Sequence, residues 1–401
     1  MPPAALGLLV CAAWYYTILA GFFILYCPVL YVMFFNHRLY RNLADTLFAL
    51  WELFPVALFQ CCCKTELHHY GDYVDRDENC IIVMNHRTRI DWNYVWIALY
   101  HATQMNHDTA DKTHNASNTS RVDSHTFDAR CEEYGALDAI GGGKAKIKFV
   151  LKDELKMVPG LGWIMQLNFF LYVKRSWRED QLGLAQFTDY YRRVRSGYRL
   201  VLFPEGTDLS DENRRKSDRF AVANNLSHLD FVLHPRTTGW TVLVSRLRGA
   251  ALAAVYDVTV AYDAPAQTEA DLLKGKLPKH VYFHFKRYPI ERLPEEEDQL
   301  RVWLNDRWRE KEYSLRQFHN NGNFCDSLNR TPIERRPRSL QTAKLAFVFW
   351  SFIDLLFMYS IFYSMVFQFW VLYHSLLFTF VTWWFGGFHN IQYKILEMTK
   401  K

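Results

Sequence analysis

A histidine and an aspartate five positions apart, His86 and Asp91, have the types and spacing that acid–base chemistry requires. They follow Cys80–Met84, a short apolar run that predicts a buried strand. From the end of a strand, a carboxylate at this offset can reach back across a turn, fix the tautomer of the imidazole and stabilise its protonated form. The imidazole could then take a proton from a hydroxyl. The alternative interpretation is that Asp91 only caps a helix.

A tight turn follows a second strand-like run, Tyr198–Phe203. The sequence Phe203-Pro-Glu-Gly-Thr207 combines Pro with Gly, which favours a turn at a strand end, where α/β proteins bind ligands. Glu205 would be held out of this turn, and Gly206 would let a ligand approach the backbone closely. An ordinary surface turn is the alternative interpretation.

Two further charged residues lie at or within strand-like runs. Arg175 ends the run Phe169–Arg175, and its guanidinium could form two parallel hydrogen bonds with a phosphate. A solvated strand end is the alternative. Asp257 lies inside Val255–Val260, where a buried carboxylate requires a partner, so its role could be purely structural.

These residues need a rigid scaffold, and the sequence between about 70 and 318 alternates strand-like with helix-like stretches. Near-continuous apolar strands alternating with helices are typical of an α/β fold. We therefore expect a mixed sheet covered by helices. The strand-like runs are Cys80–Met84, Ile147–Leu151, Phe169–Val173, Tyr198–Phe203, Ala254–Tyr262 and His280–Phe285, and the helix-like runs are Glu179–Ser196, Asp211–Asn225 and Glu296–Phe318.

Two apolar blocks precede this region. Ala4–Phe35 has no charged side chain and exceeds the roughly 20 residues that a membrane-spanning helix needs, so it predicts a membrane helix. Leu43–Cys63 contains Asp45 and Glu52, which disfavour a full crossing and favour an interfacial or re-entrant helix. The juxtamembrane run Cys61–Cys63 could be palmitoylated, or could consist of plain buried thiols.

A third apolar block, Leu345–Phe388, has Asp354 as its only acidic or basic side chain apart from a histidine. It is long enough for two crossings, which predicts a transmembrane helical hairpin with its turn near Gln368. Basic residues flank the membrane blocks, so the positive-inside rule predicts that the central region faces the cytosol. These basic residues are Arg38, Arg41, Arg335, Arg336, Arg338, Lys344, Lys394, Lys400 and Lys401.

One stretch breaks the alternation. Residues 106–143 are rich in Asn, Thr, Ser, Asp and His and end in three glycines, which predicts a disordered insertion. The insertion contains two glycosylation sequons, at Asn115 and Asn118. Because glycosylation requires the lumen, a cytosolic domain predicts that both remain unmodified.

Composition limits the class of protein. The 401 residues are 50% hydrophobic and 16% aromatic, yet the mean hydropathy is −0.16, so the apolar residues must be concentrated in blocks beside a polar domain. The net charge of +5 suits an anionic lipid surface or a polyphosphate ligand and is no signature of nucleic-acid binding.

Eight cysteines without paired spacing favour a reduced, cytosol-facing domain. No metal-hydrolase, P-loop or serine-hydrolase motif is present in the sequence, so we expect no metal.

Together, and in this order, these elements resemble the glycerophospholipid acyltransferase family. The segments that carry the resemblance are Asn85–Asp91, Phe169–Arg175, Phe203–Thr207 and Val255–Val260. Met84–Trp92, Phe203–Leu209 and Leu233–Gly239 are similar, more narrowly, to its lysocardiolipin acyltransferase branch. Many members carry a basic residue after the FPEGT threonine, whereas this chain has Asp208.

The resemblance implies a mechanism. His86 would take a proton from a free glycerol hydroxyl of the acceptor, Asp91 would orient His86, and the hydroxyl oxygen would attack the thioester of acyl-CoA without an acyl-enzyme intermediate. Acyl-CoA would be a co-substrate, and no permanently bound cofactor is expected. The residues implied for acceptor binding, or for supporting the turn in the case of Asn85, are Asn85, Arg175, Glu205, Gly206 and Thr207.

The resemblance also implies an integral membrane enzyme of the endoplasmic reticulum or of mitochondria-associated membrane. The expected organisation is membrane helices over 1–66, an acyltransferase domain over 67–318, a basic linker over 319–344, the hairpin over 345–388 and a tail over 389–401. The acceptor stays open among lysocardiolipin, lysophosphatidate, lysophosphatidylinositol and lysophosphatidylglycerol. Two other functions stay open, a catalytically silent lipid-binding scaffold and a lipid hydrolase that uses His86 to activate water.

Overall fold

The computed structural model describes residues 3–104, 145–249, 252–264, 268–326, 330–335 and 337–398. The insertion expected over 106–143, with Asn115 and Asn118, lies outside these ranges. The strands are β1 (Glu66–Gly71), β2 (Val74–Asp75), β3 (Cys80–Met84), β4 (Thr103–Gln104), β5 (Ala145–Lys152), β6 (Leu171–Val173), β7 (Gly197–Leu202), β8 (Ala254–Tyr262), β9 (His280–Pro289) and β10 (Glu334–Arg335). The α-helices are α1 (Pro3–Gly21), α2 (Cys27–Val32), α3 (His37–Ala57), α4 (Asp91–Ala102), α8 (Leu161–Leu167), α9 (Trp177–Val194), α10 (Asp211–Ala223), α11 (Thr237–Arg248), α12 (Glu269–Leu273), α13 (Glu297–Asn321), α14 (Gln341–Tyr363), α15 (Met365–Phe385) and α16 (Phe388–Met398). Short π-helical turns follow α1 and α3 at η1 (Phe22–Tyr26) and η2 (Leu58–Cys62), and 3₁₀ turns lie at η3 (Asp153–Met157) and η4 (Ile290–Arg292).

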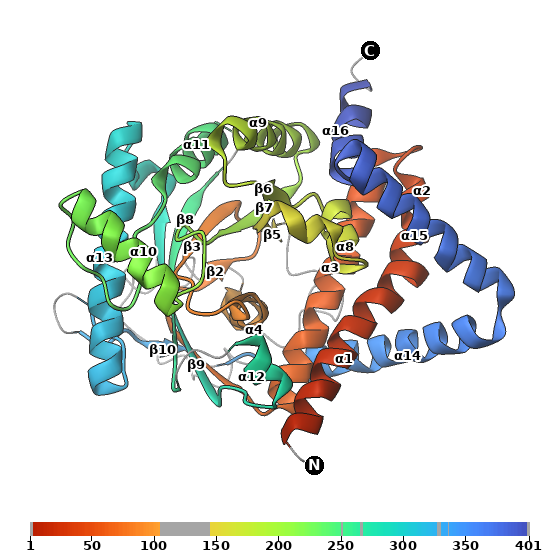
Figure 1. Cartoon of the computed structure of the whole chain (residues 1–401), viewed down its shortest axis with the longest axis horizontal. Coiled ribbons are helices and arrows are strands. Elements are labelled where there is room, and N and C mark those ends of the chain that lie inside the picture. The colour runs from red at the N-terminus through yellow and green to blue at the C-terminus, as the bar shows by residue number, and fades with distance from the viewer. Residues whose placement is uncertain are drawn as a thin grey trace, which may run out of the picture.

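The described strands include a mixed sheet of eight in the order β10-β1-β9-β8-β3-β7-β5-β6, which lies between α13 and α3 (Figure 1). Five neighbouring strands, β8, β3, β7, β5 and β6, are parallel, whereas β9 runs antiparallel to β8. The carboxyl ends of the parallel strands therefore meet at one edge of the sheet. In open α/β sheets this edge is where ligands bind.

Both faces of the sheet are buried, as β3 illustrates. Ile81 and Val83 belong to a core with side chains of α9, α11 and α13. Ile82 and Met84, on the opposite face, belong to a larger core with side chains of α1, α3, α4 and α14. Burial on both faces explains why this strand has no polar residue. The structure confirms the predicted α/β class with a mixed sheet covered by helices.

The predicted strand bounds agree best with the structure where the strand is a continuous apolar run. β3 and β8 begin and end where their apolar runs predict. β6 begins two residues later than predicted because Phe169, with φ of +54°, lies in a left-handed turn after α8. β1 was not predicted, because Glu66-Leu-His-His-Tyr-Gly71 is too polar to read as a strand. Its burial comes from pairing with β9.

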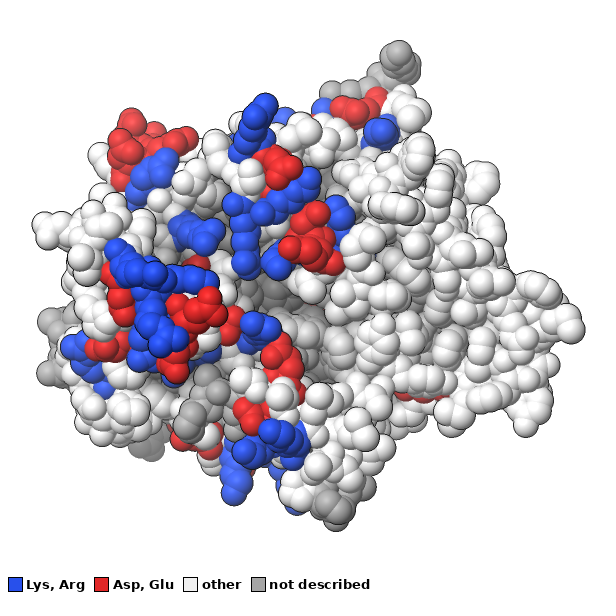
Figure 2. Space-filling model, in the orientation of Figure 1, with Lys and Arg blue, Asp and Glu red and all other residues white. Residues whose placement is uncertain are grey.

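Among the described residues, four helical segments are long and apolar enough to cross a membrane: Pro3–Val32, His37–Cys62, α14 and α15. α1, α14 and α15 lie together on the side of the molecule away from α10 and α13 (Figure 1). The surface over this side is almost entirely uncharged, whereas Lys, Arg, Asp and Glu gather over the remainder of the same face (Figure 2). An uncharged surface of this extent is suited to lipid rather than water.

The two C-terminal apolar helices meet at Ser364, so the turn predicted near Gln368 is wrong by four residues. The reason is local, since the Ser364 hydroxyl caps α15 by accepting a hydrogen bond from the backbone N–H of Phe367 at 3.2 Å. Asp354 within α14 accepts a hydrogen bond from the Thr17 hydroxyl of α1 at 2.9 Å, so this charge faces a protein partner.

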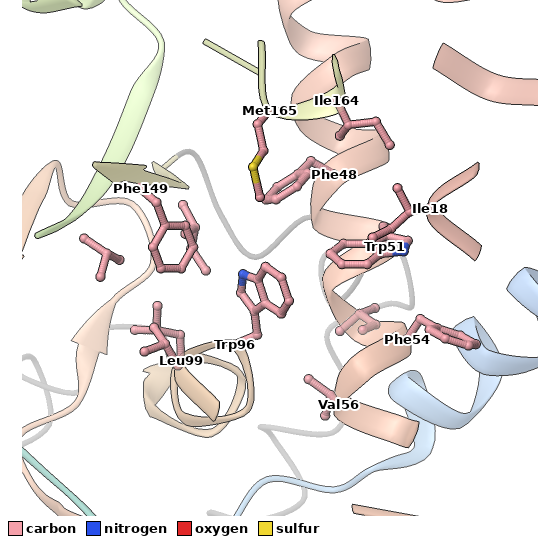
Figure 3. Close-up of a cluster of buried hydrophobic side chains, with 14 of the residues drawn as sticks. Ile18, Phe48, Trp51, Phe54, Val56, Trp96, Leu99, Phe149, Ile164 and Met165 are labelled. Carbon is pink, nitrogen blue, oxygen red and sulfur yellow. The ribbon is translucent and has the colours of Figure 1, made fainter. Parts of the chain in front are cut away.

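α3 packs into the protein core. In its most apolar stretch 67% of residues are buried, against 22% for α14 and for α15. Phe48 and Trp51 of α3 point towards Trp96 of α4 and Phe149 of β5 (Figure 3). The Trp51 and Trp96 rings meet edge to face with centroids 5.0 Å apart. α3 is therefore joined to the sheet by a continuous aromatic core.

Charged residues of α3 also have protein partners. Asp45 accepts hydrogen bonds from Arg41 at 2.9 Å and from Lys148 of β5 at 2.6 Å, and all three side chains are buried. Burial lowers the pKa of Lys148 to about 8, against the opposing charge of Asp45. Asp45, one of the two charges that disfavoured a simple membrane crossing for this helix, thus belongs to a buried network with the sheet.

Candidate active site

The sequence-predicted site residues come from loops that leave the same edge of the sheet. Asn85 and His86 follow β3, the turn Phe203–Thr207 follows β7, and Arg175 follows β6. These strands belong to the parallel part of the sheet, so their carboxyl ends face the same way. Segments that lie 28 to 122 positions apart in the sequence are thereby brought to one edge.

Asp91 is the most heavily bonded residue of this edge. Its side chain is fully buried, and its Oδ2 atom accepts a hydrogen bond from Nδ1 of His86 at 2.9 Å. The same oxygen accepts the backbone N–H groups of Arg87 at 2.7 Å and Thr88 at 3.0 Å. The other oxygen accepts the hydroxyl of Tyr262, at the end of β8, at 2.5 Å. Asp91 therefore organises the turn and orients the histidine at once. It is the first residue of α4, whose N-cap is Ile90, so its contacts are not those of a helix cap.

The pairing fixes the chemistry of His86. With its Nδ1 proton donated to Asp91, the imidazole presents Nε2 as the unprotonated, basic nitrogen. Burial lowers the pKa of His86, but the hydrogen bond and charge of Asp91, with the charges of Glu205 and Asp208, outweigh burial and raise it above its ordinary value. The Phe203 ring lies against the imidazole with centroids 4.5 Å apart and limits its rotation.

Asn85 is fully buried and bridges two strands. Its side-chain amide donates to the carbonyl oxygen of Val260 at 3.1 Å and its Oδ1 accepts the Val260 N–H at 2.8 Å. Both polar atoms of the amide are thus engaged within the sheet. This arrangement fits the support of the turn that the family resemblance implied for Asn85.

Glu205 lies behind the histidine, within the core. One of its oxygens accepts the backbone N–H of His86 at 3.2 Å and the indole N–H of Trp308 at 3.2 Å. The other accepts the backbone N–H of Leu233 at 3.1 Å. Burial raises the pKa of Glu205 to about 7, although the hydrogen bond from Leu233 and the charge of His86 oppose the shift. Its contacts are those of a residue that holds three segments together beneath the site.

Hydrogen bonds also hold the remainder of the turn Phe203–Thr207, and the residues that follow it, next to His86. Gly206 has a φ of +73°, which favours glycine, and its N–H donates to the carbonyl of Phe203 at 2.9 Å. The Thr207 hydroxyl accepts a hydrogen bond from the Asn213 side chain at 2.9 Å. The backbone N–H of Leu209 donates to the carbonyl of His86 at 2.9 Å. The turn and the strand end that carries His86 are therefore fastened to each other.

Arg175 is exposed at the end of β6 and has a φ of +64°, a left-handed conformation that is unfavourable for a side chain of this size. Its guanidinium forms no ion pair with any residue that the structure describes. Burial and then the charge of Arg236 lower the pKa of Arg175, so a second guanidinium lies close enough to repel it.

Three residues of the site were missed by sequence reasoning: Tyr262, Trp308 and Arg236. Tyr262 ends the predicted strand Ala254–Tyr262, but nothing in the sequence indicates that its hydroxyl reaches Asp91. Trp308 lies 103 positions from Glu205. Arg236 lies within Leu233–Gly239, a segment noticed only for its family resemblance, and its backbone N–H donates to the carbonyl of Pro204 at 2.8 Å.

Asp257 has the structural role that its burial suggested. It forms a buried ion pair with Lys311 of α13, whose ammonium also donates to the carbonyl of Val258 at 2.6 Å. The pair fastens α13 to β8 beneath the site. Since α13 also carries Trp308, the pair helps to position the indole that bonds Glu205.

In the part of the chain that the structure describes, one group of side chains could hold a metal ion by its geometry. Glu66, His68 and His280 have donor atoms within 4.8 Å of one another on β1 and β9. His68 already bonds Glu334 through Nδ1 at 2.6 Å and faces His280 through Nε2 at 3.2 Å. These hydrogen bonds account for the cluster without an ion, and the absence of a catalytic metal stays a prediction.

The arrangement as a whole suits general-base chemistry on a phosphate-bearing hydroxyl compound. It offers an oriented imidazole, a buried carboxylate behind it and exposed guanidinium groups at the same edge. It contains no serine or cysteine bonded to His86 among the described residues, so no nucleophile for a covalent intermediate is apparent there.

Comparison with known proteins defines the class. The profile of a family described as Acyltransferase matches residues 66–117 and 136–263, and one described as Acyltransferase C-terminus matches residues 271–350. Over 330 residues the chain is 36% identical to lysocardiolipin acyltransferase 1 of Mus musculus, which covers 81% of this chain and 77% of that protein. The chain therefore belongs to the acyltransferase family and is an enzyme that transfers acyl groups.

The chain is also similar to a second acyltransferase and to a solved structure. Over 366 residues the chain is 32% identical to lysophosphatidylinositol acyltransferase 10 of Caenorhabditis elegans, covering 88% of this chain and 83% of that protein. The crystal structure of the 1-acyl-sn-glycerophosphate acyltransferase PlsC from Thermotoga maritima is 15% identical, covers 77% of this chain and 96% of that chain, and aligns with a TM-score of 0.44. The matches to the Mus musculus and Caenorhabditis elegans acyltransferases confirm the family resemblance inferred from the sequence motifs.

Proposed function

We propose that this enzyme is an acyl-CoA-dependent O-acyltransferase that transfers a fatty acyl chain to a free glycerol hydroxyl of a lysophospholipid. The observation that carries the proposal is the His86–Asp91 hydrogen bond, which leaves Nε2 of His86 as a base at the ligand-binding edge of the sheet. Relatives named for lysocardiolipin, lysophosphatidylinositol and 1-acyl-sn-glycerol-3-phosphate support a lysophospholipid acceptor.

The reaction follows from this geometry. Nε2 of His86 takes the proton of the acceptor hydroxyl as its oxygen attacks the thioester carbonyl of acyl-CoA. The tetrahedral intermediate collapses, an ester bond forms, the carbon–sulfur bond breaks, and the CoA thiolate takes the proton from His86. Atoms and charges balance without an acyl-enzyme. General-base assistance of this kind accelerates a reaction about 10²–10⁴-fold.

The supporting residues have separate roles. Asp91 holds the tautomer of His86 and stabilises the imidazolium that forms when the proton is taken. Glu205 fixes the backbone of His86 from below, and Asn85 fixes the end of β3. The exposed guanidinium of Arg175 binds the phosphate of the acceptor, and Gly206 and Thr207 shape the turn beside it.

The acceptor reaches the site from a bilayer. The uncharged surface over α1, α14 and α15 adjoins the charged part of the molecule (Figure 2), which suits a site at the membrane surface. Placing two lipids in register supplies the part of the acceleration that the base does not. We propose the membrane of the endoplasmic reticulum, or the mitochondria-associated membrane, with the catalytic domain in the cytosol, as the basic flanks of the apolar blocks predict.

The proposal is tested by supplying the purified enzyme in lipid vesicles with radiolabelled acyl-CoA and a panel of lysophospholipids. Labelled diacyl or polyacyl phospholipid is the expected product. Labelled free fatty acid as the only product would instead indicate a hydrolase that uses His86 to activate water. No turnover with any acceptor would favour a lipid-binding scaffold.

A further inference from the structure

Arg236 lies beside the active-site turn and has no role in the mechanism above. From its position and charge we propose that Arg236 supplies a second guanidinium, in addition to that of Arg175, for the phosphate of the acceptor. This inference rests on the proposed function and deepens it, because it names a residue that selects a phosphate-bearing acceptor.

The backbone of Arg236 is fixed relative to the catalytic base. Glu205 accepts N–H groups from both His86 and Leu233, and the N–H of Arg236 donates to the carbonyl of Pro204 at 2.8 Å. The loop that ends at Arg236 is thus fastened at two points to the turn that supports His86. Pre-organisation of this kind lowers the entropy cost of holding a ligand.

The side chain of Arg236 lies across Gly206. A Cβ atom added to Gly206 would lie 3.3 Å from Nε and 3.4 Å from Cδ of Arg236. These distances are tight, so the missing side chain of Gly206 makes room for the guanidinium stem. Gly206 therefore serves both the left-handed turn and the placement of Arg236.

Arg175 and Arg236 place two positive charges near the active-site turn, and neither has an ion-pair partner among the described residues. The charge of Arg236 is the largest charge effect on the pKa of Arg175. Neither guanidinium forms an ion pair with a residue in the described parts of the chain, and both residues are exposed. The acidic neighbours of Arg175 are engaged elsewhere, since Asp208 pairs with Arg89 at 3.4 Å and Glu154 with Lys152 at 3.1 Å.

Like charges that lie close enough to repel each other are stabilised when an anion lies between them. A phosphate oxygen can accept hydrogen bonds from both guanidinium groups, which bind phosphate in a planar, bidentate manner. The residue after the FPEGT threonine is Asp208, so the turn itself contributes no cation. Arg236 contributes one there from a different segment of the chain.

The test compares Arg236→Ala and Arg236→Lys with the wild-type enzyme, with Arg246→Ala as a matched control. Arg246 is an exposed arginine on α11, the helix that follows Arg236. We expect Arg236→Ala to raise the KM for a lysophospholipid on the order of 10- to 100-fold, because a charge-assisted hydrogen bond is lost. The KM for acyl-CoA should be unchanged, Arg236→Lys should restore part of the loss, and Arg246→Ala should behave as wild type.

Three outcomes would overturn the inference while leaving the acyltransferase proposal intact. The first is an unchanged KM for the acceptor. The second is an increase only in the KM for acyl-CoA, which would place Arg236 on the phosphates of CoA. The third is an equal rise in KM with the uncharged acceptor monoacylglycerol. Failure of the proposed function is distinguishable, since the wild-type enzyme would then transfer no acyl group. A thermal-shift experiment with glycerol 3-phosphate as the probe supplies a second readout, because Arg236→Ala should weaken the stabilisation even if activity is too low to measure.

Discussion

At the scale of single residues, the site depends on two buried carboxylates that face the same histidine from different sides. Asp91 bonds the imidazole, and Glu205 bonds the backbone N–H of His86. Neither carboxylate has an exposed oxygen to offer a substrate, since both residues are buried. In the proposed mechanism the charges that bind substrate are instead the exposed arginines, Arg175 and Arg236. The two groups of residues should therefore respond differently to mutation and to pH.

Asp91→Asn should lower kcat about 10²–10⁴-fold and move the acidic limb of the pH–rate profile to lower pH. The reason is that activity requires the neutral imidazole and is lost as the pH falls through the pKa of His86. Asp91 raises this pKa, so its neutral analogue allows the imidazole to stay unprotonated to lower pH. The measurement is kcat/KM against pH. A limb that stays in place would argue against His86 as the base, and Tyr262→Phe, which keeps the carboxylate, serves as the control.

Glu205 predicts a pH dependence of stability. Its pKa is raised to about 7, so its protonated form is favoured in the folded state, and the stability it contributes is present at low pH and lost as the pH rises through about 7. Thermal unfolding followed between pH 5 and pH 8 should show this decline, and the slope should be smaller in Glu205→Gln. An equal slope in both proteins would contradict the burial argument.

At the scale of elements, a strand or turn could be predicted where its own local sequence determines its conformation. β3 and β8 are uniformly apolar runs, and the turn after β7 is defined by its own Pro and Gly. β1 was missed because its burial comes from β9, more than 200 residues away in sequence. The contact of Trp308 with Glu205 and that of Tyr262 with Asp91 were missed because each joins residues more than 100 positions apart in the sequence. Local patterns thus located His86 and Asp91, and long-range pairing supplied the residues that hold them.

The buried network of α3 gives a prediction about how elements are joined. Asp45→Ala leaves Arg41 and Lys148 buried without their carboxylate, so it should destabilise the protein by about 3–5 kcal/mol. Arg41→Ala leaves the Lys148 pair intact and should cost less. Thermal unfolding in detergent micelles measures both. The reverse order would mean that Arg41, and not Asp45, is the centre of the network.

At the scale of the whole molecule, charge and hydropathy divide the surface into two parts. The uncharged part consists of helices that are long enough to span a membrane, and the catalytic edge belongs to the charged part (Figures 1 and 2). α3 differs from the other apolar segments, since most of its apolar stretch is buried in the protein. This helix couples the membrane part to the sheet.

The cytosolic orientation predicts that Asn115 and Asn118 carry no glycan when the chain is expressed in eukaryotic cells, because glycosylation requires the lumen. Endoglycosidase treatment should leave the electrophoretic mobility of the protein unchanged. A sequon engineered into a lumenal loop of a reporter protein expressed in the same cells is the positive control. A mobility shift of this chain would reverse the proposed topology.

The central claim is that His86 is the base in a direct transfer from acyl-CoA to a lysophospholipid. The most direct test measures transfer of radiolabelled acyl chains by wild type and His86→Ala in the same vesicles, with binding of both substrates measured in parallel. The account predicts at least a 100-fold loss of transfer with substrate binding retained. Transfer at the wild-type rate by His86→Ala would contradict it.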